Sequence, residues 1–235
     1  MDTSVGETRR SLGSAAGMLL TGQAFYILIT QLHAGGDAND HHAIFEEYAH
    51  SGIWSAVHVG QFAGMALILA GLVCLILALD GRARQVGWFG AALAGATLAL
   101  YAALQAVDGV ALKQAVSAWA HASEADQSAR FTGAETIRWL EWGMRSYNDY
   151  MMGLTLLVFA IAVSRAAWGS FLISALMALS GFAYLAQGWI AGSQGFSPAQ
   201  SIAIVSAWVL SACWMAGLAI AAWGHRRVPL SPVFE

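Results

Sequence analysis

Residues 199–224 read AQSIAIVSAWVLSACWMAGLAIAAWG and contain no Asp, Glu, Lys or Arg. A helix needs about 20 mostly apolar residues to cross the roughly 30 Å of hydrocarbon in a bilayer. This stretch meets that requirement without a charged side chain. It therefore predicts a membrane-spanning helix.

Five further stretches of the same character precede it. The predicted spans cover about 12–33, 53–79, 85–109, 146–166, 168–189 and 199–224. The whole chain is 58% apolar and only 11% charged, which is outside the range of ordinary soluble domains. We expect an all-α fold with one integral membrane domain over residues 1–235, a six-transmembrane-helix bundle capped by helices on its outer face.

The arginines predict the orientation of this bundle. Seven of them fall at chain ends or turns that six spans place on one side: Arg9, Arg10, Arg82, Arg84, Arg165, Arg226 and Arg227. Cytoplasmic loops carry the excess of Lys and Arg in membrane proteins. We therefore expect a multi-pass protein of the plasma (inner) membrane with both termini in the cytoplasm.

Two longer segments, 34–52 and 110–145, then face outward. The helical pattern of the third span continues to Ala122, and Ser123 begins a polar break. Thr132 and Glu135 have the spacing of a capping box, in which a hydroxyl and a carboxylate satisfy the first free N–H groups of a helix. The sequence predicts a new helix from about 133 into the fourth span.

Five of the seven histidines lie in residues 33–58, HAGGDANDHHAIFEEYAHSGIWSAVH. His42, Glu46 and His50 follow one another at intervals of four, so they share one face of a helix that Asn39 or Asp40 can cap. Imidazole and carboxylate ligands suit zinc, iron and copper. These three residues are the first candidate metal ligands.

The same segment has a structural interpretation without a metal. Ile44, Phe45 and Tyr48 lie opposite the His42 face, so the helix over 40–50 can rest in the membrane interface with its apolar side in the bilayer. Ser51 and Gly52 then break this helix before the second span.

Three polar residues are expected inside the membrane: His58, Gln61 and Asp108. Ionisable groups there are costly and indicate function. His33 is expected at a similar depth to His58, and the two are further candidate ligands for a metal ion or haem. The alternatives are a neutral His58 bonded to a neighbouring helix and an Asp108 paired with Lys113 or an arginine.

The fourth helix carries a stripe of alternating charge, formed by Glu135, Arg138, Glu141, Arg145 and Asp149. Such spacing is typical of a salt-bridged, solvated helix face. The alternative is a vestibule that binds anions, since arginine is the preferred partner of carboxylate and phosphate.

Three functions remain open from the sequence. The first is an outward-facing His/Glu-rich site that binds a divalent metal or haem for redox or hydrolytic chemistry. The second is a carrier of a small solute, ion or proton, and the third a non-catalytic membrane subunit that binds a partner through its outer cap. The expected partners are the lipid bilayer and a membrane protein or second copy, and no nucleic-acid footprint is present.

Overall fold

The computed structural model describes residues 3–224 of the chain. All regular structure in this range is helical, and six helices are long and apolar enough to cross a membrane. The elements are α1 (Thr3–Thr30), α2 (His41–His50), α3 (Trp54–Leu75), the 3-10 turn η1 (Ile76–Ala78), α4 (Gly81–Ala106), the π-helical turn η2 (Val107–Leu112), α5 (Lys113–Ala120), α6 (Glu124–Ser164), α7 (Phe171–Gln194) and α8 (Pro198–Gly224). The predicted all-α class and the predicted number of long apolar helices are confirmed.

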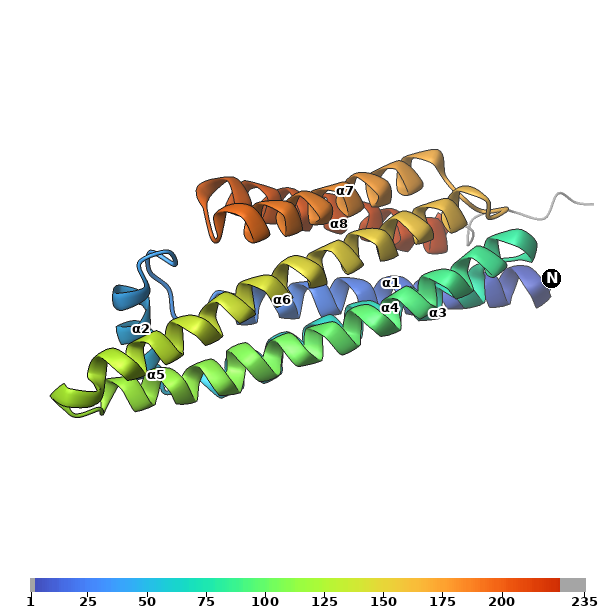
Figure 1. Ribbon diagram of the computed structural model, residues 1–235. Coiled ribbons are helices and arrows are strands. Elements are labelled where there is room, and N and C mark those ends of the chain that lie inside the picture. Colours follow the sequence, from blue (N-terminus) through green and yellow to red (C-terminus); the bar gives the residue numbers. More distant parts are fainter. Residues whose placement is uncertain (1–2, 225–235) are drawn as a thin grey trace, which may run out of the picture.

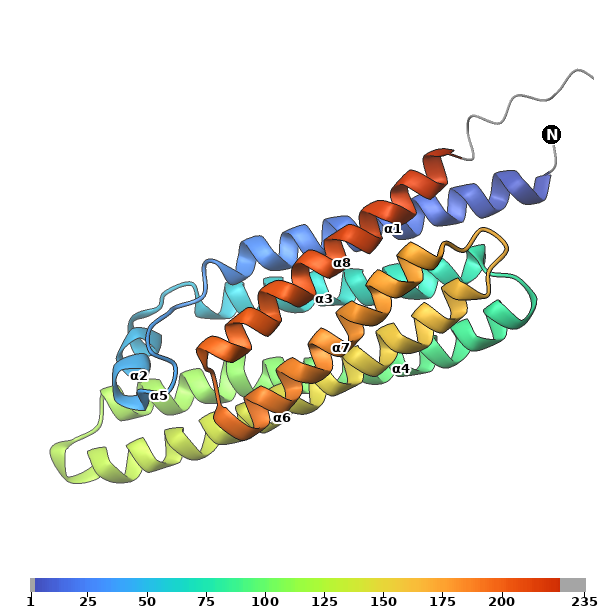
Figure 2. The same cartoon turned by 90° about the horizontal axis from the view of Figure 1, so that it is seen from above.

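The long helices run along one common direction and give an elongated molecule (Figure 1). They form a closed ring in which α1 packs on α3, α3 on α4, α4 on α6, α6 on α7, α7 on α8, and α8 back on α1 (Figure 2). The short helices α2 and α5 lie together at one end, beside the first turns of α6. The start of α1 lies at the other end.

Glycines let two of these helix pairs approach closely. A Cβ atom at Gly64 of α3 would lie 2.9 Å from Tyr26 Cβ on α1, and one at Gly153 of α6 would lie 2.7 Å from the carbonyl oxygen of Gly181 on α7. Close packing of this kind drives helix association where lipid removes the hydrophobic driving force. The contacts fix α1 against α3 and α6 against α7.

The half of the ring nearest the start of α1 has an apolar core. Fully buried side chains from four helices meet there, including Leu12, Leu72, Leu156, Phe159 and Trp214. The polar buried residues described below lie in the other half. The two halves of the ring therefore differ in their cores. This half is mainly apolar, and the other half contains buried polar and charged side chains.

Helix α2 forms as the sequence predicts, but its apolar face does not lie free. Asp40 caps it by accepting a hydrogen bond from the Ala43 N–H at 3.1 Å, and the helix ends at His50. Ile44, Phe45 and Tyr48 are buried against α5, η2 and α6. The interpretation of this face as a bilayer anchor is wrong, because the protein itself covers it.

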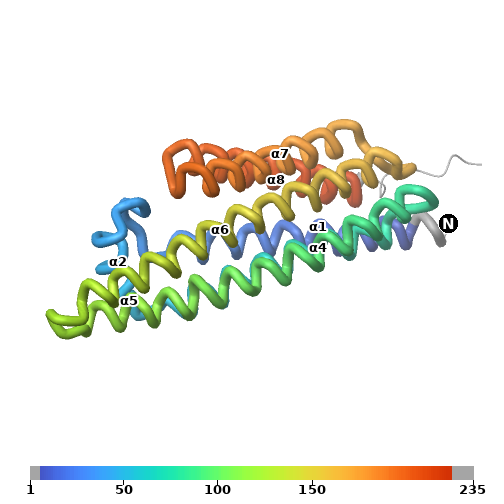
Figure 3. The backbone as a smooth tube through the Cα atoms, viewed as in Figure 1, coloured from blue at the N-terminus to red at the C-terminus, as the bar shows by residue number. Residues whose placement is uncertain are grey.

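The predicted helix start near 133 is also wrong. Helix α6 begins at Glu124 and runs without a break to Ser164 (Figure 3). Thr132 does not cap a helix, since its hydroxyl donates to the Ser128 carbonyl oxygen one turn earlier within α6. The long helix brings residues 133–149 alongside η2 and α2.

The helix ends differ from the predicted spans in ways that matter for the site. Helix α1 stops at Thr30, so His33 lies in the turn that follows it. The third apolar helix continues through η2 and α5 to Ala120 rather than ending at 109. The break at residues 51–53 occurs as expected, and α3 then begins at Trp54.

Several of the arginines used for orientation gather at one end. Arg9, Arg84 and Trp168 line one cavity at the turns between helices, and the Trp168 Nε1–H donates to the Ala78 carbonyl oxygen at 2.6 Å. Arg226 and Arg227 lie outside the described residues.

Candidate metal centre

Three elements that are distant in the sequence bring His33, His58 and Asp108 together. His33 follows α1, His58 lies one turn into α3, and Asp108 lies in the π-helical turn η2. Their ligand atoms all lie within 4.8 Å of one another, and the rings of His33 and His58 are 5.1 Å apart between centroids. Among residues 3–224 this is the one cluster of its kind that the structure forms.

The backbone orients both histidine rings. His33 Nδ1 lies 2.7 Å from the Ala34 carbonyl oxygen, and His58 Nδ1 lies 2.8 Å from the Trp54 carbonyl oxygen. A carbonyl oxygen can only accept, so the neutral rings carry their protons on Nδ1 and keep a lone pair on Nε2. Metal-bound histidines are held in the same way, with the second ring nitrogen donating to a carbonyl or carboxylate.

His58 and Asp108 approach each other closely at a buried position. His58 Nε2 lies 3.2 Å from Asp108 Oδ2, and the two side chains are 3% and 8% exposed. A neutral His58 and an ionised Asp108 present only lone pairs to each other across this gap. Either a second proton on His58 or a metal ion between the two atoms relieves the repulsion.

The second carboxylate oxygen of Asp108 leaves room for another ligand. Oδ1 is buried and has no hydrogen-bond partner among the described residues. The Lys113 amine, an expected counter-charge, donates to the Tyr48 and Ala49 carbonyl oxygens at 2.6 and 2.8 Å and closes the end of α2. The expected pairing of Asp108 with Lys113 is therefore wrong.

The π-helical turn places Asp108 against α3. The indole N–H of Trp54 donates to the Asp108 carbonyl oxygen at 3.2 Å, and a Cβ atom at Gly109 would lie 2.8 Å from the Cβ of His58. Only a glycine at 109 lets η2 approach His58 this closely. Single π-helical turns inside α-helices are frequent at functional sites.

The cluster has nearly the dimensions of a metal site. Ligand atoms bonded at about 2.1 Å to one ion lie roughly 3.0–3.4 Å apart in four- or six-coordinate geometry. The separation of His58 and Asp108 already lies in this range. The three ligand atoms lie within 4.8 Å of one another, so binding a single ion requires them to move closer together.

Burial also favours the neutral form of His33, which is the form that binds a metal ion. Loss of hydration lowers the pKa of the His33 imidazole, and the nearby Asp108 carboxylate opposes this less strongly. His33 is therefore neutral at neutral pH. A metal ion binds neutral imidazole.

The charged stripe of α6 lies beside this cluster and is mostly buried. Arg138, Glu141 and Asp149 are 2%, 1% and 3% exposed. An Arg138 Nη1–H donates to Glu141 Oε2, and the guanidinium of Arg138 lies over the rings of Tyr48 and Phe196. The prediction that water covers this face of α6 is wrong for these residues. They form a charged column inside the protein.

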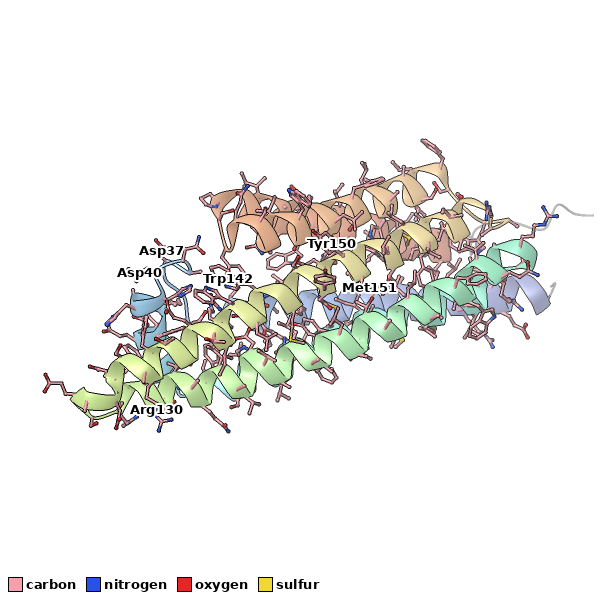
Figure 4. All side chains as sticks on the ribbon, viewed as in Figure 1. Asp37, Asp40, Arg130, Trp142, Tyr150 and Met151 are labelled. Atoms are coloured by element: carbon pink, nitrogen blue, oxygen red, sulfur yellow. The ribbon has the colours of Figure 1, made fainter. Side chains whose placement is uncertain are left out.

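Glu135 differs from the rest of the stripe. Its Oε1 lies 2.9 Å from Nδ1 of His41, and this pair joins α2 to α6. Figure 4 shows Asp37, Asp40 and Trp142 at the same end of the molecule, while Arg130 points away from the helices. The first turns of α6 thus hold α2 over the polar half of the ring.

Two neighbouring cavities lie along the column. The cavity beside α2, named the outer cavity, has a volume of about 300 Å³. It is lined by His33, Asp108, Arg138, Glu141 and Arg145, and by polar residues that include Gln61, Gln200 and Ser201. The inner one has about 90 Å³ and is lined by Arg145, Asn148, Asp149 and the rings of Tyr26 and Tyr184. Thr30, Arg145 and Ile204 line both.

A third, mostly apolar groove reaches the cluster from the opposite side. It has a volume of about 310 Å³ between α3 and α4 and is lined by His58, Val59, Phe62 and Gln105. Gln61 points the other way, with its Nε2–H donating to Thr30 Oγ1 at 3.2 Å. The cluster therefore lies between a polar cavity and an apolar groove.

The residues first predicted to bind a metal on α2 do not gather. His42 Nδ1 lies 3.4 Å from Glu46 Oε1 with both side chains largely exposed, and His50 Nδ1 is 2.7 Å from the carbonyl oxygen of Glu46. In the described part of the chain, these three do not form a cluster of three ligand atoms. The structure gathers His33 and His58 with Asp108 instead.

Comparison with protein-family models, with curated proteins and with solved structures found no match to this chain. The class of protein therefore follows from fold and site alone. It is a multi-pass, membrane-type helical protein with a buried cluster of two histidines and one carboxylate.

Proposed function

We propose that this chain is a six-span protein of the plasma membrane that holds one divalent metal ion on His33, His58 and Asp108 for redox or hydrolytic chemistry. Both termini lie in the cytoplasm, and α2, α5 and the first turns of α6 form the outer cap. The single observation that carries the proposal is the 3.2 Å approach of His58 Nε2 to Asp108 Oδ2 in a buried site.

The donor set suits particular metals. Two histidines and one carboxylate with open positions are the ligands of non-haem iron(II) oxygenases, and the same set holds catalytic zinc in hydrolases. Iron would support redox chemistry and zinc hydrolysis. A haem fits less well, because its porphyrin fills the four equatorial positions and leaves no place for the Asp108 carboxylate.

The topology has support from the surface as well as from the arginines. Large apolar side chains such as Val59, Phe89 and Phe171 are exposed on the outer faces of the long helices. Lipid accounts for such a surface on a six-helix ring. The bilayer is thus the first partner of this protein.

The cavities bear on the carrier alternative. The charged column of α6 favours entry of a solute from the end beside α2, and the cavities along it extend as far as Asn148 and Asp149. Past Asp149 along α6 most of the buried side chains are apolar, such as the fully buried Leu156 and Phe159, and the buried Thr155 bonds to Thr97. A closed inner half favours a binding site over a route across the membrane.

The experiment is metal binding by purified protein in lipid nanodiscs. The wild-type chain should bind about one zinc or iron(II) ion, and each of His33→Ala, His58→Ala and Asp108→Asn should lose it. His42→Ala and His121→Ala are matched controls, since both histidines are exposed and lie outside the cluster. Equal binding by the cluster variants and the wild type would overturn the proposal.

A further inference from the structure

Arg145 lies at the junction of the two polar cavities next to the metal cluster. It lines the outer cavity together with His33 and Asp108, and it lines the inner cavity together with Asp149. A guanidinium at this place can reach a molecule that also touches the metal ion. Its own pairing therefore decides what the cavity can bind.

Arg145 makes no salt bridge within 4.0 Å in the part of the chain that the structure describes. Its Nε–H is buried and has no hydrogen-bond partner there. The neighbouring carboxylate of Glu141 is already bonded to Arg138. Asp149 supplies the nearest further negative charge, but it lines only the inner cavity.

The charges of the outer cavity favour an anion once a metal is present. The Asp, Glu and Arg side chains that line it are Asp108, Glu141, Arg138 and Arg145. Counted as fully ionised, these two carboxylates and two guanidiniums cancel, and Asp149 counts for at most one negative charge in the inner cavity. A divalent ion on the cluster then leaves a net positive charge of one to two.

Resting on the metal centre proposed above, we propose that the outer cavity binds a small carboxylate between the metal ion and Arg145. One carboxylate oxygen occupies an open position on the metal, and the planar guanidinium binds the carboxylate with two N–H groups. Gln200 and Ser201 supply polar walls for the rest of the molecule. The single charge of a carboxylate does not exceed this net positive charge.

The test uses cobalt(II)-loaded protein in nanodiscs, with acetate as the probe and the visible cobalt spectrum as the readout. Acetate should shift the spectrum of the wild type. Arg145→Met should keep the cobalt spectrum but bind acetate at least about tenfold more weakly, the size expected for a lost charge-assisted hydrogen bond. Arg130→Met is the control on the same helix, because Arg130 is exposed and points away (Figure 4).

A second variant distinguishes a direct loss of acetate binding from misfolding of the single variant. Arg145→Met leaves Asp149 buried without its nearest cation, whereas Arg145→Met/Asp149→Asn removes both charges together. The double variant should fold, bind cobalt and show the same loss of acetate affinity. Acetate affinity within twofold of the wild type in this variant would overturn the inference, and so would tighter binding of inorganic phosphate than of acetate.

The metal proposal and this inference fail in different ways. If the wild type binds no cobalt, both fall. If cobalt binds and acetate binding does not depend on Arg145, only the carboxylate site falls. If metal-free protein binds acetate as tightly as loaded protein, measured by calorimetry, the metal takes no part and the bridged geometry is wrong.

Discussion

His58 and Asp108 face each other across 3.2 Å in the polar half of the helix ring, with the proton of His58 directed away toward the Trp54 carbonyl oxygen. The lone pair of a neutral imidazole and a carboxylate repel each other at this distance in a buried site, so the pair requires either a second proton on His58 or a metal ion between the two atoms.

Asp108→Asn should weaken metal binding by at least about 100-fold, because it replaces a charged ligand with a neutral one. The matched control is Glu47→Gln, which changes an exposed carboxylate on α2 outside the cluster. Competition with a chelator of known affinity measures both. Similar affinities for the two variants would remove Asp108 from the ligand set.

Trp54→Phe should lower metal affinity by about tenfold, the effect typical of groups that orient a ligand without touching the metal. The indole N–H of Trp54 donates to the Asp108 carbonyl oxygen, and Trp54 is buried. Trp139→Phe is the control, because Trp139 is exposed on α6. An unchanged affinity in Trp54→Phe would mean that η2 holds Asp108 without help from α3.

Gly109→Ala should displace His58, since the added Cβ would lie 2.8 Å from the Cβ of His58. We expect a loss of about 1–3 kcal/mol in the free energy of unfolding, together with weaker metal binding. Gly133→Ala on α6 has no atom within 4 Å of the added Cβ and should stabilise the helix by up to about 1 kcal/mol. Thermal unfolding in detergent compares the pair, and equal effects would contradict the close packing of η2 on α3.

Glu141→Gln should destabilise the protein by about 3 kcal/mol, because it leaves the buried guanidinium of Arg138 without its carboxylate. The double change Arg138→Met/Glu141→Leu should recover most of this loss, since it removes both charges. Glu124→Gln at the exposed start of α6 is the control and should have little effect. A small loss in Glu141→Gln would mean that water reaches the column.

The sequence predicted the apolar helices because their signal is local. A run such as 199–224 has no charged residue and needs no partner to be recognised as a span. The break at Ser51 and Gly52 and the Asp40 cap are local in the same sense. These features were found correctly, and they place His33 and His58 at neighbouring helix ends.

The remainder of the site depends on tertiary contacts that one sequence does not contain. Asp108 was expected inside the membrane, but only the packing of η2 on α3 brings it to His58. The stripe of α6 has the same spacing whether water or protein covers it. The apolar face of α2 likewise has the same pattern against lipid as against α5.

The most direct test of the central claim is an anomalous-difference map of the protein crystallised with zinc or iron(II). We predict one strong peak within about 2.1 Å of His33 Nε2, His58 Nε2 and a carboxylate oxygen of Asp108. A peak on His42, Glu46 and His50, or no peak at all in the polar half of the ring, would contradict it.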